Sequence, residues 1–268
     1  MPLDLDKLAK LSISFCPDPG PGSFTATFDA EPPGGRHFGS VNAGSGRSLR
    51  VGGTGLNGQF ERDLAAAGQP VAAFQRLHEG LMQLACASPG CIVEAPPPLV
   101  AGHRGLVAAF ARVADGDGST FVAVDLLREE YRPRHPANIA MIYCVGPDRR
   151  QYRSDAEFLA SLEQLGEGLA VTCSGCASLA EAATPKLPRL QRVRVGLVSG
   201  GKYAGRVPKA LVAGSLLRGV ARGAKEQDIE YEFAYDEGVF EHAWHDLLSE
   251  GRRQTPIAAE GVLAKESE

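Results

Sequence analysis

Short runs of apolar and β-branched residues recur along the chain and predict strands rather than long buried segments. Polar residues or turn-forming glycines and prolines separate most of these runs. The predicted strands cover residues 11–16, 24–28, 38–42, 121–127, 139–145, 169–173, 193–199 and 229–235.

Other segments place apolar residues at helical spacing. Ser154 and Glu157 have the spacing of a capping box, which predicts a helix that begins there. Pro208 suits the first turn of another helix, and two further apolar stripes lie at 71–85 and 240–248. Strands that alternate with helices predict an α/β fold with a largely parallel or mixed sheet.

The length of 268 residues suits one well-filled domain with insertions. We expect a single domain over 1–251 that carries an irregular insertion at about 95–136, where prolines and glycines are frequent. The polar segment 252–268 is expected to form a mobile tail.

Composition narrows the classes of function. A net charge of -4 and a pI near 5.9 argue against bulk binding to nucleic acid or to an anionic membrane. The sequence has no apolar run long enough to span a membrane and no secretory pattern at its N-terminus, so a cytoplasmic location is expected. Six cysteines are too few for a disulfide scaffold in a chain of this length.

A glycine-rich segment is the strongest indication of chemistry. Six glycines lie between positions 44 and 58, after the predicted strand 38–42 and before an apolar helical stretch. Such a loop presents backbone N–H groups to a phosphate, although flexible connections have a similar composition. The segment matches neither the P-loop nor the GxGxxG pattern.

A second glycine loop covers 199–208, again between a predicted strand and a predicted helix. Two such loops are suited to hold a diphosphate from both sides. The only basic residue between Ser199 and Gly205 is Lys202, which can add a charge-assisted contact to a phosphate.

The motifs and their order resemble those of macrodomains, an α/β family that binds ADP-ribose. The chain has V-N-A at 41–43, a glycine loop at 52–58, V-G-P at 145–147 and the late serine-glycine loop at 199–208. The resemblance covers roughly residues 30–248 and implies a three-layer α/β/α sandwich with a central mixed sheet. It also implies a ligand across the C-terminal ends of the strands, with no cofactor.

The same resemblance implies that the ligand is ADP-ribose, free or attached to a macromolecule. It also implies the residues that bind this ligand, which are carried over position by position. The ligand-binding set is Ser45, Gly53, Thr54, Gly55, Leu56, Ser199, Gly200, Gly201, Lys202, Tyr203 and Tyr235.

Hydrolysis of ADP-ribose linkages is left open because the family's catalytic pattern is altered. Gly44 and Ser45 stand where hydrolytic members carry Ala-Asn, and Asn57 stands in place of an aspartate. An amide orients water but cannot act as a general base. The candidates for positioning the water are Asn42, Asn57, Tyr203 and His37. If the chain is an enzyme, it removes mono-ADP-ribose or processes an ADP-ribose phosphate; the alternative is an inactive structural or protein-interaction module.

No set of histidines and cysteines has the spacing of a metal site, so no metal is predicted. Cys173 and Cys176 form a lone C-x-x-C pair at the end of the predicted strand 169–173. Arg192 and Arg194 belong to a basic run that forms either an anion patch or a solvated strand edge.

Overall fold

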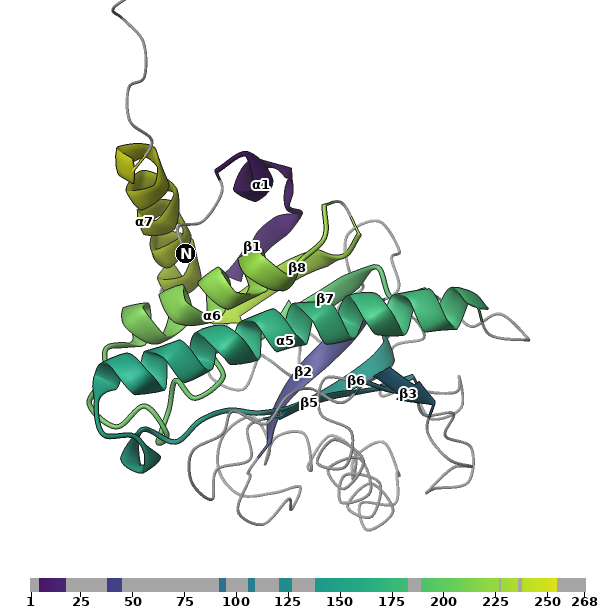
Figure 1. Ribbon diagram of the computed structural model, residues 1–268, viewed down its shortest axis with the longest axis horizontal. Coiled ribbons are helices and arrows are strands. Elements are labelled where there is room, and N and C mark those ends of the chain that lie inside the picture. Colours follow the sequence, from purple (N-terminus) through teal and green to yellow (C-terminus); the bar gives the residue numbers. More distant parts are fainter. Residues whose placement is uncertain are drawn as a thin grey trace, which may run out of the picture.

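The computed structural model describes residues 5–17, 38–44, 92–94, 106–108, 121–126, 138–182, 189–226, 228–235 and 238–254. Within them, six strands form a mixed sheet in the order β1-β8-β7-β2-β6-β5 (Figure 1). The strands are β1 Ile13–Pro17, β2 Phe38–Gly44, β5 Phe121–Leu126, β6 Asn138–Val145, β7 Arg192–Val195 and β8 Glu230–Tyr235.

All neighbouring strands of this sheet are parallel except β5, which runs antiparallel to β6. The C-terminal ends of β1, β8, β7, β2 and β6 therefore lie along one edge, called the C-terminal edge below. In open α/β sheets, ligands bind outside this edge. The sequence placed five of these six strands to within about two residues; β7 ends earlier than predicted.

A second, two-stranded antiparallel sheet pairs β3 (Ile92–Glu94) with β4 (Leu106–Ala108). Both β4 and β5 fall inside the predicted insertion 95–136, and β5 forms an edge of the main sheet. The insertion thus contributes a strand to the central sheet.

The helices of the described residues begin with the short α1 (Leu5–Lys10) and the 3-10 turn η2 (Arg149–Gln151). Three long helices follow: α5 (Asp155–Ala182), α6 (Lys209–Gly223) and α7 (Val239–Gln254). Figure 1 shows α5 and α6 side by side across the sheet. The serine half of the predicted capping box at α5 is confirmed, since the Glu157 N–H donates to Ser154 Oγ at 3.2 Å; the Glu157 carboxylate accepts from the Arg153 N–H at 3.0 Å. Pro208 is the N-cap residue of α6.

The predicted strand 169–173 is wrong, because these residues lie inside α5. A buried strand would hide alternate residues, yet Val171 is 50% exposed between the buried Leu169 and Cys173. The buried side chains follow helical spacing from the capping box onward, as Leu165, Leu169 and Cys173 do. Tertiary packing of this long amphipathic stripe outweighs the local β-branched composition. The C-x-x-C pair therefore lies on a helix and not at a strand end.

Glycines allow α5 and α6 to approach at backbone distance. A Cβ atom on Gly219 would lie 1.9 Å from the Glu163 carbonyl oxygen, and one on Gly166 would lie 2.4 Å from the Leu216 carbonyl oxygen. Any side chain at these positions would force the helices apart. The two glycines therefore fix the spacing of the helical layer.

The helical layer packs on one face of the sheet. Tyr231 and Phe233 of β8 are buried there, with the Tyr231 hydroxyl donating to the Ala170 carbonyl at 3.3 Å. The Phe233 ring lies 4.8 Å from the ring of Phe240 in α7. Because strand side chains alternate between faces, the residues between these aromatics project to the opposite face.

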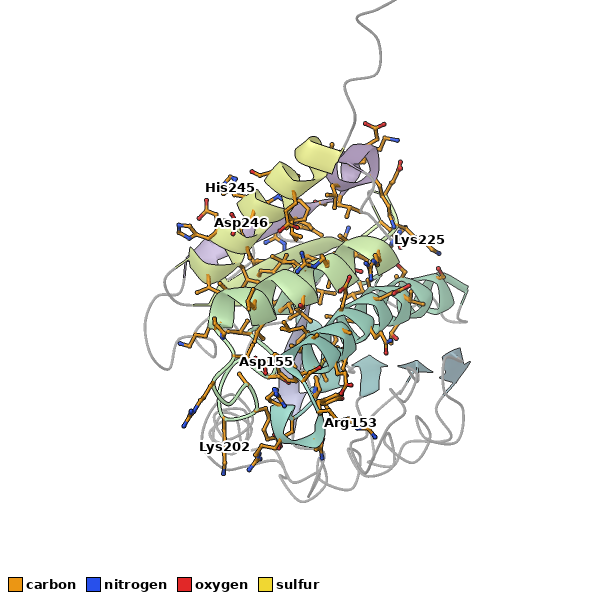
Figure 2. The ribbon with its side chains drawn as sticks, turned by 60° about the vertical axis from the view of Figure 1, so that its left-hand side comes forward. Arg153, Asp155, Lys202, Lys225, His245 and Asp246 are labelled. Atoms are coloured by element: carbon orange, nitrogen blue, oxygen red, sulfur yellow. The ribbon has the colours of Figure 1, made fainter. Side chains whose placement is uncertain are left out.

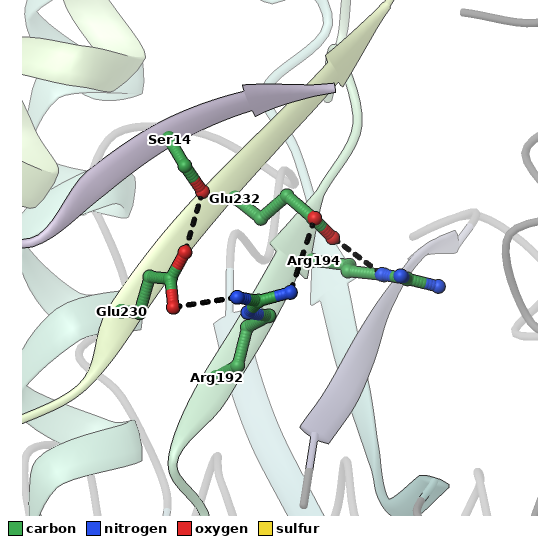
Figure 3. Close-up of polar contacts among 5 residues, drawn as sticks. All are labelled: Ser14, Arg192, Arg194, Glu230 and Glu232. Carbon is green, nitrogen blue, oxygen red and sulfur yellow. Dashed lines mark hydrogen bonds and ion pairs between the residues drawn. The ribbon is translucent and has the colours of Figure 1, made fainter. Parts of the chain in front are cut away.

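That opposite face holds a row of buried charges across β1, β8 and β7 (Figure 3). Arg192 bonds Glu230 at 2.8 Å and Glu232 at 3.4 Å, and Arg194 bonds the other oxygen of Glu232. Ser14 Oγ donates to Glu230 at 2.8 Å. The expectation of a solvated strand edge is wrong for Arg192 and Arg194, which are 5% and 3% exposed.

At β7 and β8 both faces of the sheet are thus withdrawn from solvent, as a three-layer arrangement requires. The predicted α/β class and the central mixed sheet are confirmed. None of the helices in the described residues is long and apolar enough to cross a membrane.

Candidate functional site at the C-terminal edge of the sheet

Two of the sequence motifs meet at the C-terminal edge. Strands β2 and β6 pair in parallel register, which sets Ala43 beside Cys144 and Gly44 beside Val145. V-N-A therefore ends next to the strand that leads into Gly146 and Pro147. Parallel pairing brings together motifs that lie about a hundred residues apart in the sequence.

The late serine-glycine loop joins them at Ser199. Its hydroxyl donates to the Pro147 carbonyl at 2.7 Å, and the side chain is buried. Ser199 has a φ of 60°, the only positive φ among the described non-glycine residues. A Cβ on Gly146 would lie 2.2 Å from Ser199 Oγ, so Gly146 makes room for this contact. Such backbone strain is retained where surrounding structure holds it, often at functional sites.

The rest of the loop is held by turns and by apolar anchors. The Ala204 N–H donates to the Gly201 carbonyl at 3.0 Å, and the Val207 N–H donates to the Ala204 carbonyl at 3.1 Å. Ala204 and Val207 are buried in the core. The Arg149 N–H also donates to the Tyr203 carbonyl at 2.8 Å, which ties the loop to η2. The loop is therefore preorganised.

Within this fixed loop, Gly201 and Lys202 present unused donors. Neither backbone N–H has an acceptor among the described residues, and a Cβ on Gly201 would meet nothing within 4 Å. The Lys202 side chain is exposed and likewise makes no ion pair there. Adjacent free N–H groups with a nearby ammonium group are a typical anion-binding arrangement.

Sequence reasoning missed the residues that hold η2, the turn to which the loop is tied. Asp148 caps η2 and is buried, and it accepts two bonds from Arg150, at 2.9 Å from Nε and 2.5 Å from Nη2. The hydrogen bond to Asp148 is the main cause that raises the pKa of the Arg150 guanidinium. An aspartate directly after V-G-P and two residues before an arginine was the available signal.

The structure brings together one part of the predicted site. Ser199, Gly200, Gly201, Lys202 and Tyr203 share the loop, with Ser199 and Gly200 buried and Tyr203 half-buried. The serine hydroxyl is used by Pro147, so the backbone and Lys202 remain to face a ligand.

For two other predicted site residues, only the position of the backbone in the sheet is described. Asn42 lies in β2 beside Tyr143, and Tyr235 ends β8 beside Pro17, both near the C-terminal edge. The remaining predicted site residues lie outside the described residues: His37, Ser45, Gly53, Thr54, Gly55, Leu56 and Asn57.

No cluster of three or more metal-ligating side chains occurs among the residues that the structure describes. The Cys144 and Cys173 thiols are buried and form no disulfide there, and burial raises the pKa of Cys144 to about 12. A thiol with so high a pKa stays protonated and is a poor nucleophile.

The fold and the edge define an α/β protein with a preorganised loop in which two N–H groups have no acceptor among the described residues. No protein-family model matches the chain. Two relatives named DNA/RNA-binding protein ALBA4 are each 29% identical, that of Plasmodium falciparum over 83% of this chain and that of Plasmodium yoelii yoelii over 87%. The chain spans 63% and 64% of the length of these relatives.

Solved macrodomains are similar to the chain over most of its length. A mutant of the Oceanobacillus iheyensis macrodomain is 14% identical with a TM-score of 0.48, covering 93% of this chain and 98% of that chain. Another mutant of it, with ADPR, is 13% identical with a TM-score of 0.47, covering 95% and 99%. The Trypanosoma brucei macrodomain in complex with ADP-ribose is 12% identical with a TM-score of 0.44, covering 88% and 69%.

Proposed function

We propose that this chain is a divergent macrodomain that binds ADP-ribose, free or attached to a macromolecule, at the C-terminal edge of its sheet. One observation carries the proposal. V-N-A, V-G-P and the serine-glycine loop, far apart in the sequence, converge there through the β2–β6 pairing and the Ser199–Pro147 bond. Convergence of motifs that resemble a ligand-binding family supports a shared site more strongly than any motif alone.

The chemistry of the loop fits the diphosphate part of this ligand. A diphosphate needs several donors at fixed positions and little else. The free N–H groups of Gly201 and Lys202 and the Lys202 ammonium group supply them on one side. The glycine loop at 52–58 is proposed to supply the opposite side, as the resemblance implies.

Thermal unfolding with ADP-ribose tests binding. A ligand that binds the native state alone stabilises it by about 2.7 kcal/mol at 100 times its Kd, so the melting temperature should rise by several degrees. Gly201→Asp should abolish the rise, because it sets a carboxylate in the open space beside the free N–H groups. Gln164→Asp, which adds one negative charge at an exposed position of α5, is the matched control.

No rise in melting temperature at millimolar ADP-ribose would refute the binding proposal. It would favour the alternative of a structural or protein-interaction module.

A second assay separates binding from hydrolysis. The protein is incubated with a mono-ADP-ribosylated substrate, and the label retained on the substrate is followed with time. Loss of label that depends on Asn42, Asn57 or Tyr203 would make the chain a hydrolase with these residues as the catalytic candidates. Retained label together with a ligand-induced rise in melting temperature makes it a binding protein.

Nucleic acid is a second candidate ligand, favoured by the likeness to relatives named DNA/RNA-binding. The net charge of -4 opposes binding over the whole surface, so any contact must be local. Fluorescence anisotropy with a labelled RNA and a labelled single-stranded DNA, at several salt concentrations, tests this candidate. Absence of a salt-dependent signal at micromolar protein would dismiss it.

A further inference from the structure

The outer side of β1 is an open edge of the main sheet. In the strand order β1 has one neighbour, β8, and no second partner among the described residues (Figure 1). The Tyr231 N–H donates to the Ser12 carbonyl at 2.9 Å, so Ser12 and Ser14 turn their backbone groups toward β8. Because these groups alternate along a strand, Ile13 and Phe15 turn theirs outward. Neither of the two outward N–H groups has an acceptor in the part of the chain that the structure describes.

This edge lacks the usual protection against pairing with another chain. Proteins commonly place charged side chains on an exposed edge strand, but segment 11–17 holds no charged residue. Ser12 is exposed, and Ile13 and Phe15 are half-buried, so the edge is accessible. Pro17 occupies the next outward position, where a residue without an N–H is tolerated only because no neighbouring strand needs that donor.

We propose that two copies of this chain associate through antiparallel pairing of their β1 strands about a two-fold axis at Ser14. The pairing joins two six-stranded sheets into one continuous sheet. About this axis Ile13 of one copy lies opposite Phe15 of the other, and each of the two symmetric pairs exchanges both of its N–H···O=C bonds. This inference goes beyond the proposed function and does not depend on ADP-ribose binding.

The side chains of β1 are self-complementary about this axis, which favours a second copy over a foreign strand. Ile13 and Phe15 point to the helical face, where the Phe15 ring lies 6.4 Å from the Phe233 ring. Ser14 points to the opposite face, where its hydroxyl donates to Glu230. Antiparallel pairing therefore sets apolar side chains of both copies together on one face and the serines together on the other. A second copy has this match by symmetry.

Helix α7 follows β8, lies over this end of the sheet and runs back antiparallel to β1 (Figure 1). The Phe240 ring lies 4.8 Å from the Phe233 ring, and Phe233 pairs with Phe15. Ser14 is one residue nearer the start of β1, about 3.3 Å along the strand, which corresponds to about two residues of helix. A two-fold axis at Ser14 therefore passes near residues 242–243 of α7.

The same axis brings the flanks of the two α7 helices together in opposite directions. Ala243 faces α6, since a Cβ on Gly214 would lie 3.9 Å from the Ala243 Cβ. At about 100° per residue, Glu241 and His245 lie on the flank turned away from α6, and both are exposed. Figure 2 shows His245 at the outer surface of α7. Glu241 of one copy then approaches His245 of the other, whose imidazole N–H donates to the carboxylate.

Sedimentation velocity on the full chain, from about 1 to 200 µM, measures dimer formation by mass action. Ile13→Pro removes the outward N–H and leaves the bonds to β8, whereas Ile13→Val keeps that N–H and is its matched control. Glu241→Arg is the second variant, at an exposed helical position outside the sheet. Asp246→Arg makes the same charge change on another flank of α7, where Figure 2 shows this side chain. Circular dichroism checks that each variant is folded.

We expect the parent protein to dimerise with a Kd of about 10 µM, because the shared edge is short. Ile13→Pro should weaken the dimer about tenfold or more, since each copy loses one exchanged bond. Glu241→Arg should weaken it about threefold or more, and both controls should behave as the parent. In amide hydrogen exchange, the N–H groups of Ile13 and Phe15 should become protected as the protein concentration rises.

A monomer at all these concentrations would overturn the inference. A dimer that leaves the Ile13 and Phe15 amides unprotected would also overturn it, because its interface would lie elsewhere. Protection of these two amides in the monomer would show that the edge is already covered, with the same consequence. Equal dimer affinity in Ile13→Pro and Ile13→Val, or equal losses in Glu241→Arg and Asp246→Arg, would refute the proposed contacts. None of these outcomes bears on ADP-ribose binding.

Discussion

Ser199 offers the sharpest test of how the candidate loop is built, because its hydroxyl and its backbone act in opposite directions on stability. The hydroxyl satisfies the buried Pro147 carbonyl at 2.7 Å, and its loss leaves that acceptor unpaired at a cost of about 1–3 kcal/mol. The φ of 60° costs a non-glycine residue about 1–2 kcal/mol. Ser199→Ala loses the bond and keeps the strain, whereas Ser199→Gly loses the bond and relieves the strain.

We therefore expect both variants to be less stable than the parent, with Ser199→Gly the more stable of the two by about 1 kcal/mol once the greater freedom of unfolded glycine is included. Urea unfolding monitored by circular dichroism measures this difference, which corresponds to about 2–4 °C in melting temperature. Both variants should also weaken ADP-ribose binding, because the loop loses its tie to the end of β6.

Ser249 is the matched control, since it is an exposed serine in α7 whose hydroxyl donates to the His245 carbonyl at 2.9 Å. In a helix, alanine is favoured over glycine by about 1 kcal/mol, so the order of the two variants should reverse there. An alanine variant at Ser199 as stable as the glycine variant, or more stable, would refute the reasoning that the loop is held in a strained conformation.

Three further substitutions test the scaffold. Gly219→Ala should destabilise the protein in urea by about 1–3 kcal/mol despite better helix propensity, because its Cβ would lie 1.9 Å from the Glu163 carbonyl; unchanged stability would show that α5 and α6 separate freely. Arg194→Met should cost about 3–5 kcal/mol by leaving the buried Glu232 short of a partner, and adding Glu232→Gln should restore part of it in a double-mutant cycle. Burial raises the pKa of Cys144 from 9.0 to about 12, so as pH rises the thiol of the unfolded chain loses its proton before the thiol of the folded protein does. The stability that this buried neutral thiol contributes is therefore complete below pH 9 and falls by about 1.4 kcal/mol per unit above it, so Cys144→Ala should show a shallower decline in urea titrations at pH 8 and 10; parallel declines would contradict the assignment.

The elements that the sequence predicted well are those whose signal is local. The capping box at Ser154 and the proline at 208 mark helix starts through contacts within a few residues. Strand β6 is a short apolar run and β8 alternates glutamates with aromatic residues, so both patterns predict a strand locally. Segment 169–173 was mistaken because its local β-branched composition conflicts with a stripe that only packing against the sheet makes visible.

The roles of individual polar residues could not be predicted from local sequence in the same way. Arg192 and Arg194 look like surface charge in a linear sequence, and only the register of β7 with β8 shows that Glu230 and Glu232 neutralise them in the interior. Asp148 is a different case, because its bond to Arg150 spans only two residues and the sequence carried that signal. The bond between Arg192 and Glu232, in contrast, joins residues 40 positions apart. Long-range pairing carries no local signature.

The sequence by itself determined the fold class, most strand positions and the presence of a glycine loop suited to phosphate, since periodicity, caps and glycine frequency are properties of short segments. Only the tertiary structure decided that the V-N-A and V-G-P strands lie side by side, that the Ser199 hydroxyl donates to Pro147, and that the N–H groups of Gly201 and Lys202 have no acceptor among the described residues. The physical reason is that a hydrogen bond or a shared sheet edge between distant residues depends on strand order, which the chain acquires only when its sheet assembles.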